Sequence, residues 1–139
     1  MIDEYLLIKN LINKMRNAAF FLYTSKEVLI LRKKDGYYKG QWSGPGGNIE
    51  RGETPKEGAI RELKEETGID YHNLEGEINI ILRQDQTRIY LLKVKKIPKP
   101  KLSKEHDKYA LVNSKDLDNY NLTPYFKETW EYIKEEKLL

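Results

Sequence analysis

The stretch GNIERGETPKEGAIRELKEETGI, residues 47–69, decides the fold of this chain. Thr54 suits the N-cap of a helix and Pro55 suits the first helical position, where no backbone N–H is needed. Glu57 lies three residues after Thr54 and completes a capping box with it. Gly68 suits a left-handed stop at the other end. The sequence therefore predicts a helix that begins at about Pro55 and ends just before Gly68.

This helix would bring several carboxylates onto one face. At about 100° per residue, Glu65 lies roughly 60° to one side of Glu62 and Glu66 roughly 40° to the other. Like charges at this spacing destabilise a helix by roughly 0.2–0.5 kcal/mol per pair. A hard divalent cation, most simply Mg²⁺ with Mn²⁺ as a substitute, would offset this repulsion; the alternative is a solvated charged face. The adjacent, buried stripe is expected to hold Ala59, Ile60, Leu63 and Thr67.

The spacing of this stretch resembles the Nudix box, the signature of the Nudix hydrolase family. Five residues separate Gly47 from Glu53, and seven separate Glu53 from Arg61. The box then continues as RELKEETGI from Arg61 to Ile69. Every position that the box defines is matched, so the chain is identified as a member of this family on a resemblance that covers residues 47–69.

The resemblance implies roles for the residues in and beside the box. Glu62, Glu65 and Glu66 resemble the family's metal-binding carboxylates, and Glu62 is also a frequent general base. Gly46 resembles the residue whose backbone carbonyl joins the metal shell. Arg61 resembles the structural arginine that orients the glutamates. Spacing supports that last role, since Arg61 lies one turn before Glu65 and can pair with it.

Two further acidic residues resemble family features. Glu53 resembles a supporting carboxylate that is sometimes linked to the metal. Glu105 and His106 precede a predicted strand, and many Nudix enzymes carry a glutamate in that loop that reaches the metals or serves as the base. The alternative is a flexible charged loop at residues 103–108, because a short local match is a weak signal. A lone histidine such as His106 is more often exposed or hydrogen-bonded than catalytic.

Substrate contacts are expected from residues just before the box. An aromatic side chain there would stack on a nucleobase, which contributes about 1–3 kcal/mol per base; the alternative is loop anchoring and core filling. Lysines there would steer a polyphosphate, although exposed lysines usually serve solubility. The candidates are Tyr37, Tyr38 and Trp42 for stacking and Lys33, Lys34 and Lys39 for phosphate, with Tyr38, Trp42 and Lys39 as first choices.

Composition bounds the class of protein. A chain of 139 residues suits one domain, 1–139, here with a helical extension at residues 1–16. The absence of cysteine excludes disulfides, thiolate metal sites and a cysteine nucleophile, and fits a cytoplasmic location. A net charge of +3 is too mild to indicate nucleic-acid binding but is compatible with polyphosphate ligands. No segment is apolar enough to span a membrane.

The remaining periodicity predicts strands and helices on both sides of the box. In the strand at residues 75–83, alternation places Ile78, Ile80 and Leu82 on one face. The overall pattern favours an α/β (α+β) fold with a mixed β-sheet sandwiched between α-helices, as in the Nudix fold. The predicted strands are residues 17–24, 27–33, 75–83, 87–95 and 108–113, and the predicted outer helices are residues 2–15 and a last helix that opens at Thr123 and Pro124.

The family resemblance implies a Mg²⁺-dependent hydrolase that cleaves a pyrophosphate bond in a nucleoside diphosphate linked to another group. The stretch from Ile69 to Val94 lacks the proline of the ADP-ribose type, and no coenzyme A signature is present. Nucleoside triphosphates are therefore the first choice, dinucleoside polyphosphates the second, and a capped or triphosphorylated RNA end the third. A binding protein without turnover is disfavoured because all the box glutamates are present. The expected assembly is a monomer or a homodimer.

Overall fold

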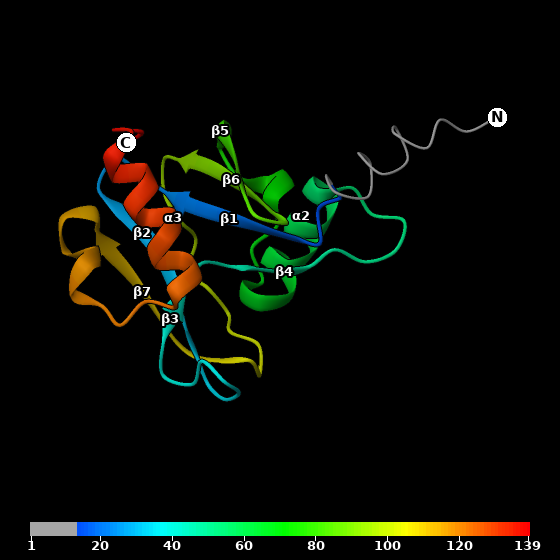
Figure 1. Cartoon of the computed structure of the whole chain (residues 1–139), viewed down its shortest axis with the longest axis horizontal. Coiled ribbons are helices and arrows are strands. Elements are labelled where there is room, and N and C mark those ends of the chain that lie inside the picture. Colours follow the sequence, from blue (N-terminus) through cyan, green and yellow to red (C-terminus); the bar gives the residue numbers. More distant parts are fainter. Residues whose placement is uncertain (1–13) are drawn as a thin grey trace.

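A computed structural model describes residues 14–139 (Figure 1). The expected helix over residues 2–15 lies outside this part, except for Lys14 and Met15, which have no regular secondary structure. The elements in chain order are β1 (Asn17–Tyr23), β2 (Glu27–Lys33), β3 (Trp42–Ser43), β4 (Gly46–Asn48), α2 (Pro55–Thr67), η1 (Tyr71–Asn73), β5 (Gly76–Gln84), β6 (Thr87–Val94), β7 (His106–Asn113), η2 (Ser114–Asn119) and α3 (Pro124–Glu135).

The sheet forks beside β1. On one side β1 runs parallel to β6, and β6 pairs with β5 in an antiparallel hairpin. On the other side β1 pairs with β2 at Tyr23 and with β4 at residues 17–19, so two partners share one edge. β2 in turn pairs with β3 and β7. The strands therefore separate into a β1–β4 arm and a β2–β3 arm.

Helices cover both faces of the sheet, as the sequence predicts (Figure 1). On one face, Ala59 and Leu63 of α2 pack with Phe20 of β1. On the other face, α3 packs its apolar stripe against Phe21 of β1. Phe20 and Phe21 are neighbours in the sequence and both are buried, because β1 has a helix over each of its two faces. The apolar stripe of α3 consists of Phe126, Trp130 and Ile133.

One expectation about β5 is wrong. The register of β5 against β6 shifts between Ile78 and Ile80, which marks a β-bulge. The extra residue reverses the alternation, so Ile78 packs into the core under α2 while Ile80 and Leu82 pack into the core under α3. Within residues 14–139, no helix combines the length and apolar character needed to cross a bilayer.

Candidate active site

The acidic helix α2 has fixed ends. The side chain of Thr54 accepts a hydrogen bond from the backbone N–H of Glu57 at 3.2 Å, and Glu57 accepts one from the N–H of Thr54 at 2.9 Å. Gly68 has φ of 72° and donates its N–H to the carbonyl of Lys64. The predicted capping box, bounds and C-cap are therefore confirmed. Because both ends are fixed, the rotation of the glutamates about the helix axis is fixed as well.

The glutamates of this helix lie in three different environments. The Glu66 side chain is only 3% exposed, and it accepts a 2.7 Å hydrogen bond from the backbone N–H of Gly46. The Glu62 side chain is 16% exposed and touches Gly47, where a Cβ atom would lie 2.7 Å from the Glu62 carboxyl carbon. The Glu65 side chain is 56% exposed. The carboxylates thus run from buried to solvated.

Arg61 holds the acidic cluster together. Its Nε donates to Glu53 at 2.8 Å, and its Nη1 donates to Glu62 at 3.0 Å and to Glu65 at 3.1 Å. Its Nη2 donates to the carbonyl of Asn48 at 2.9 Å. The expected pairing of Arg61 with Glu65 is present, and the guanidinium also lowers the pKa of Glu53. Arg61 therefore connects α2 to the segment that precedes it.

Burial controls the protonation of the inner carboxylates. It raises the pKa of Glu66 to about 8, against the opposing effect of the Gly46 hydrogen bond. The positive charge of Lys33 also lowers this pKa, while the charge of Glu62 raises it. Burial likewise raises the pKa of Glu62 above its ordinary value. A bound cation would reverse this balance, because it favours the ionised form.

His106 is buried rather than exposed. Its side chain is 1% exposed, and neither ring nitrogen has a hydrogen-bond partner among the described residues. Burial, assisted by the charge of Lys33, lowers the pKa of His106 to about 4. Sequence reasoning expected the strand to begin at Lys108, but β7 begins at His106, which pairs with Lys33 of β2. The apolar run that ends β7 gives no sign of this burial.

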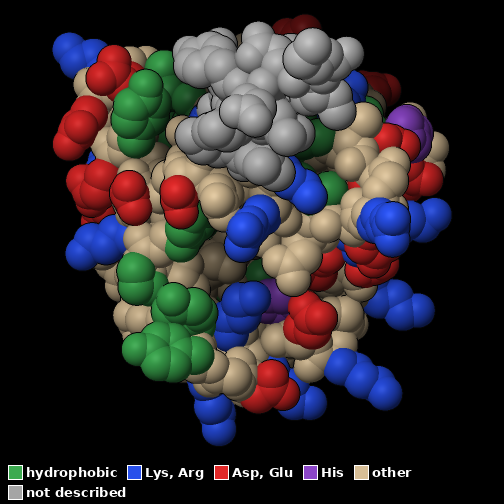
Figure 2. Space-filling view, turned by 45° about the vertical axis from the view of Figure 1, so that its right-hand side comes forward, with side chains coloured by type: hydrophobic (Ala, Val, Ile, Leu, Met, Phe, Trp, Pro, Cys, Tyr) green, Lys and Arg blue, Asp and Glu red, His purple; other side chains and the backbone are tan. Residues whose placement is uncertain are grey.

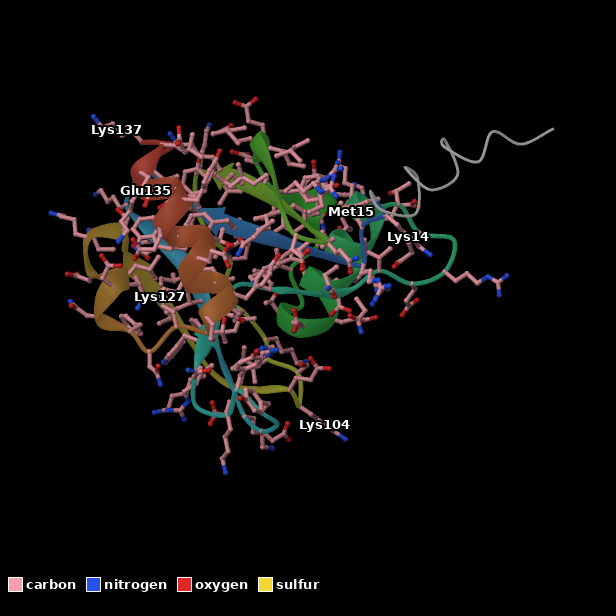
Figure 3. The ribbon with its side chains drawn as sticks, viewed as in Figure 1. Lys14, Met15, Lys104, Lys127, Glu135 and Lys137 are labelled. Carbon is pink, nitrogen blue, oxygen red and sulfur yellow. The ribbon has the colours of Figure 1, made fainter. Side chains whose placement is uncertain are left out.

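The loop before β7 is tied to α2. The N–H of Ser103 donates to the carbonyl of Glu66 at 3.3 Å, and the N–H of Lys34 donates to the carbonyl of Glu105 at 3.0 Å. Lys104, by contrast, points away from the body of the molecule at the tip of this loop (Figure 3). One ligand atom from each of Glu66, Glu105 and His106 lies within 4.8 Å of the other two. The structure therefore brings the predicted loop glutamate to the acidic helix.

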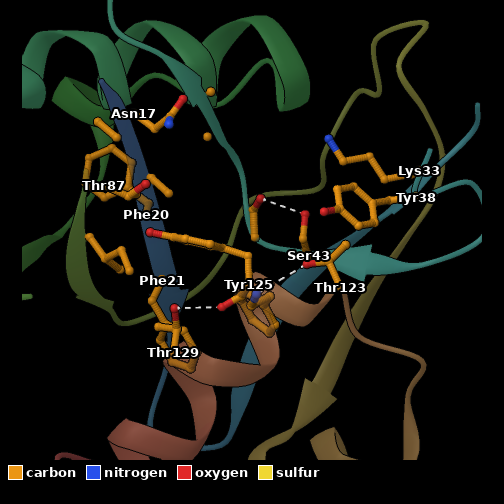
Figure 4. A pocket seen from close by; sticks show the side chains of 17 residues that line it. Asn17, Phe20, Phe21, Lys33, Tyr38, Ser43, Thr87, Thr123, Tyr125 and Thr129 are labelled. Atoms are coloured by element: carbon orange, nitrogen blue, oxygen red, sulfur yellow. Dashed lines mark hydrogen bonds between the residues drawn. The ribbon is translucent and has the colours of Figure 1, made fainter. Parts of the chain in front are cut away.

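A cavity of about 310 Å³ opens at the fork of the sheet and reaches α3 (Figure 4). Its wall includes Gly46 and Gly47, the residues that touch Glu66 and Glu62. The cavity and the acidic cluster therefore share one stretch of backbone. Its lining combines the apolar side chains of Phe20, Phe21, Ile89 and Phe126 with the polar groups of Asn17, Ser43, Thr87, Thr123, Tyr125 and Thr129.

The predicted substrate contacts fall in different places. Tyr38 lines the cavity, and so does Lys33 (Figure 4). Trp42 does not; it packs edge-on against Tyr120, with ring centroids 5.4 Å apart, beside the core under α3. Lys39 is exposed and is not part of the cavity wall. Tyr37 is 94% exposed. The geometry thus groups Tyr38 and Lys33 with the cavity, and places Trp42 and Lys39 outside its wall.

The family described as NUDIX domain matches residues 13–135. A mouse protein named bis(5'-nucleosyl)-tetraphosphatase [asymmetrical] is 38% identical over 110 residues, which cover 73% of this chain and 69% of the mouse protein. An RNA pyrophosphohydrolase from Nitratiruptor sp. is 34% identical over 117 residues, which cover 68% of this chain and 75% of that protein.

Other relatives are much longer. The chain matches 25% of the length of Nudix hydrolase 2 and 18% of the length of Nudix hydrolase 5, both from Arabidopsis thaliana. Among solved structures, a Nudix hydrolase from M. smegmatis, RenU, aligns with a TM-score of 0.75 at 16% identity and covers 90% of this chain and 86% of that chain. At this level of identity the structural likeness concerns the fold alone.

Proposed function

Because the chain belongs to the NUDIX domain family, we propose that it is a pyrophosphohydrolase that depends on a divalent cation. Its substrate would be a nucleoside diphosphate linked to a further group, and its reaction would be hydrolysis of the phosphoanhydride bond. The residues of the site fit a divalent cation. Glu66 is a buried carboxylate held by a single backbone N–H, and the unpartnered ring of His106 lies beside it. A bound cation would supply the missing partner of the His106 ring and would balance the charge of the Glu66 carboxylate.

One observation carries the proposal: the cavity and the carboxylates meet at Gly46 and Gly47. A nucleoside in the cavity would have its phosphate chain directed across these glycines toward Glu62 and Glu66. Neither glycine has a side chain to block that path. Mostly apolar walls with a few polar groups are typical of ligand pockets, and Tyr38 supplies an aromatic ring at the edge.

Nucleoside triphosphates are the substrates that we propose first. A volume of about 310 Å³ is small for a ligand pocket and suits a single nucleoside. A dinucleoside polyphosphate is the second candidate, and it is favoured by the likeness to the mouse tetraphosphatase. An RNA 5' end is the third, by likeness to the RNA pyrophosphohydrolase. Basic and acidic side chains intermix on the face shown in Figure 2, a pattern that does not favour a long polyanion.

The chain's own residues supply the positioning and the proton transfer. A bound divalent ion would neutralise charge on the phosphates and lower the pKa of a water molecule. Glu62, whose pKa burial raises, would accept the proton of that water, and Glu105 is the alternative base. Glu65 and Glu66 would hold the cation together with Glu62. Arg61 keeps Glu62 and Glu65 in position through its two Nη1 hydrogen bonds.

The test is turnover by the purified chain. Mg²⁺ would be supplied with a panel of nucleoside triphosphates and one dinucleoside tetraphosphate, and the products would be separated and identified. The proposal expects a nucleoside monophosphate and pyrophosphate from a triphosphate, with at least about 10²-fold loss of kcat in Glu62→Gln. Binding of these nucleotides without turnover, or full turnover by Glu62→Gln, would overturn it. The ratio of kcat/KM values between the two substrate types would decide the substrate class.

A further inference from the structure

The ring of His106 is the part of the site that the proposed hydrolysis leaves unexplained. Both of its nitrogens are buried, and neither forms a hydrogen bond with any residue that the structure describes. A buried polar group without a hydrogen-bond partner destabilises the folded state. Buried polar groups almost always have a partner, so an exception calls for a specific explanation.

The surroundings of the ring indicate what the missing partner is. Nδ1 of His106 lies 3.7 Å from Oε2 of Glu66, too far for a hydrogen bond. Ligand atoms bound to one transition-metal ion at about 2.0–2.2 Å lie roughly 3–3.5 Å apart when they are neighbours. Glu105 places a carboxylate oxygen within 4.8 Å of both groups. The three side chains therefore lie close enough to become ligands of one ion after their ligand atoms approach one another by about 1–2 Å at most.

The backbone holds these three residues in place. Oε1 of Glu66 is occupied by the N–H of Gly46, which leaves Oε2 toward His106. The backbone carbonyl of Glu105 accepts a hydrogen bond from the backbone N–H of Lys34, and the backbone N–H of Glu105 donates to the hydroxyl of Ser103. His106 itself begins β7 and pairs with β2. The three ligands therefore come from a helix (α2), a strand (β7) and a hydrogen-bonded loop, and their positions are largely fixed without the ion.

We propose that Glu66, Glu105 and His106 form a second metal position, which shares Glu66 with the cation held by Glu62 and Glu65, and that this position prefers first-row transition-metal ions such as Mn²⁺ to Mg²⁺. The preference follows from the ligands. Mg²⁺ takes oxygen ligands and keeps several waters, whereas an imidazole nitrogen suits first-row transition metals. Three protein ligands leave the other coordination positions open for water or a phosphate oxygen. The inference rests on the proposed function only in assigning a divalent ion to this end of α2.

Pulsed electron paramagnetic resonance of the Mn²⁺-loaded full chain, without substrate, tests the assignment. The chain has two histidines, His72 and His106, and no cysteine, so a nitrogen signal has few sources. His72 is exposed and serves as the matched control. We expect a histidine ¹⁴N coupling to Mn²⁺ in the wild type and in His72→Gln, and its loss in His106→Gln. Mn²⁺ binding without a nitrogen coupling, or a coupling that survives in His106→Gln, would overturn the proposal.

A second measurement does not depend on the folding of a variant. Wild-type chain with ¹⁵N-labelled histidine should show the ¹⁵N coupling pattern in place of the ¹⁴N pattern, and an unchanged spectrum would exclude a histidine ligand. Calorimetric titration then tests selectivity: His106→Gln should weaken Mn²⁺ binding by about 10–100-fold and Mg²⁺ binding by less than about threefold. Equal losses for the two ions would refute the preference. Both experiments omit nucleotide, so their failure is separate from failure of hydrolysis.

Discussion

The backbone N–H of Gly46 donates a 2.7 Å hydrogen bond to the carboxylate of Glu66, twenty residues later in the chain. This bond joins β4 to α2 and opposes the effect of burial on the pKa of Glu66. Without a cation it is too weak to keep the carboxylate ionised at neutral pH, since the pKa of Glu66 lies at about 8. The protonation of this residue therefore links stability to pH and to metal.

The first prediction concerns the stability of the metal-free protein. The pKa of Glu66 is about 8 in the folded state and about 4.3 in an unfolded chain, so above pH 4.3 the unfolded state binds fewer protons. Stability should therefore fall as pH rises toward 8, by up to about 1.4 kcal/mol per unit. The pKa of His106 is about 4 in the folded state and about 6.5 in an unfolded chain, so its titration opposes this slope near pH 6.5 and has little effect above about pH 7.5.

Urea unfolding in the presence of a chelator would measure this slope. The free energy of unfolding should drop by about 1 kcal/mol between pH 6.5 and 8, and Glu66→Gln should remove this drop. With saturating Mg²⁺ or Mn²⁺, binding at pH 6.5 should release about one proton, and the slope should reverse because the ion binds the ionised form. A flat profile for the wild type would show that Glu66 is ionised in the empty site.

The second prediction tests the close approach at Gly47. A Cβ atom there would lie 2.7 Å from the carboxylate of Glu62, a flexible side chain that can move aside. Gly47→Ala should therefore retain its melting temperature within a few degrees and lose about 10²-fold or more in kcat. Gly52→Ala is the control: its φ of 87° is strained for alanine, but open space surrounds the position. It should lose about 1 kcal/mol of stability and keep kcat. If Gly47→Ala kept kcat while Gly52→Ala lost it, Glu62 would have no role in the reaction.

Local sequence accounts for α2, because the groups that start and stop it lie within a few residues of each end. Thr54 and Glu57 cap the helix through bonds that span three residues, and Gly68 ends it by its own backbone freedom. The glutamate register follows from these ends alone. This is why the acidic cluster and the mixed sheet flanked by helices could be predicted from sequence, the latter with the help of the Nudix box.

The environments of the same residues depend on contacts between distant segments. Burial of Glu66 requires β4, and burial of His106 requires that β7 pair with β2 from its first residue. The cavity exists because β1 and β2 pair at Tyr23, beside the turn that joins them, and diverge toward Asn17, which no local pattern signals. Trp42 was expected at the substrate, yet its neighbour Tyr120 comes from the far end of the chain. Sequence periodicity carries only indirect information about such long-range contacts. In β5 the bulge after Ile78 reverses the alternation, so periodicity assigns Ile78 to the wrong face.

The third prediction concerns Arg61, whose guanidinium bonds several acceptors at once. Lysine cannot reproduce this fork, so Arg61→Lys should release Glu62 and Glu65 and lower kcat by about tenfold or more. Its cost in stability should be about 1–3 kcal/mol, since the lost bonds are charged and those to Glu53 and Glu62 are partly buried. The measurements are thermal unfolding and steady-state kinetics.

The control for Arg61 is Arg32, which also donates two hydrogen bonds to one carboxylate, that of Asp107, at 2.8 and 2.7 Å. This pair lies at the surface, where salt bridges contribute about 0–1 kcal/mol. Arg32→Lys should therefore cost less than about 1 kcal/mol and leave kcat unchanged. Similar losses in both variants would mean that Arg61 acts as an ordinary surface arginine.

The last prediction separates the two tyrosines of the β2–β3 loop. Tyr38 lines the cavity, while Tyr37 is 94% exposed and contacts Tyr38 edge-on at 5.0 Å between ring centroids. If a base stacks in the cavity, Tyr38→Ala should raise KM by about tenfold, in line with about 1–3 kcal/mol per stacked base, with little change in kcat. Tyr37→Ala should leave the KM for a nucleoside triphosphate within about twofold. A larger effect of Tyr37→Ala than of Tyr38→Ala would contradict base binding in the cavity. It would indicate instead that the substrate contacts the exposed side of the loop, as a dinucleoside polyphosphate could with the group beyond its phosphates.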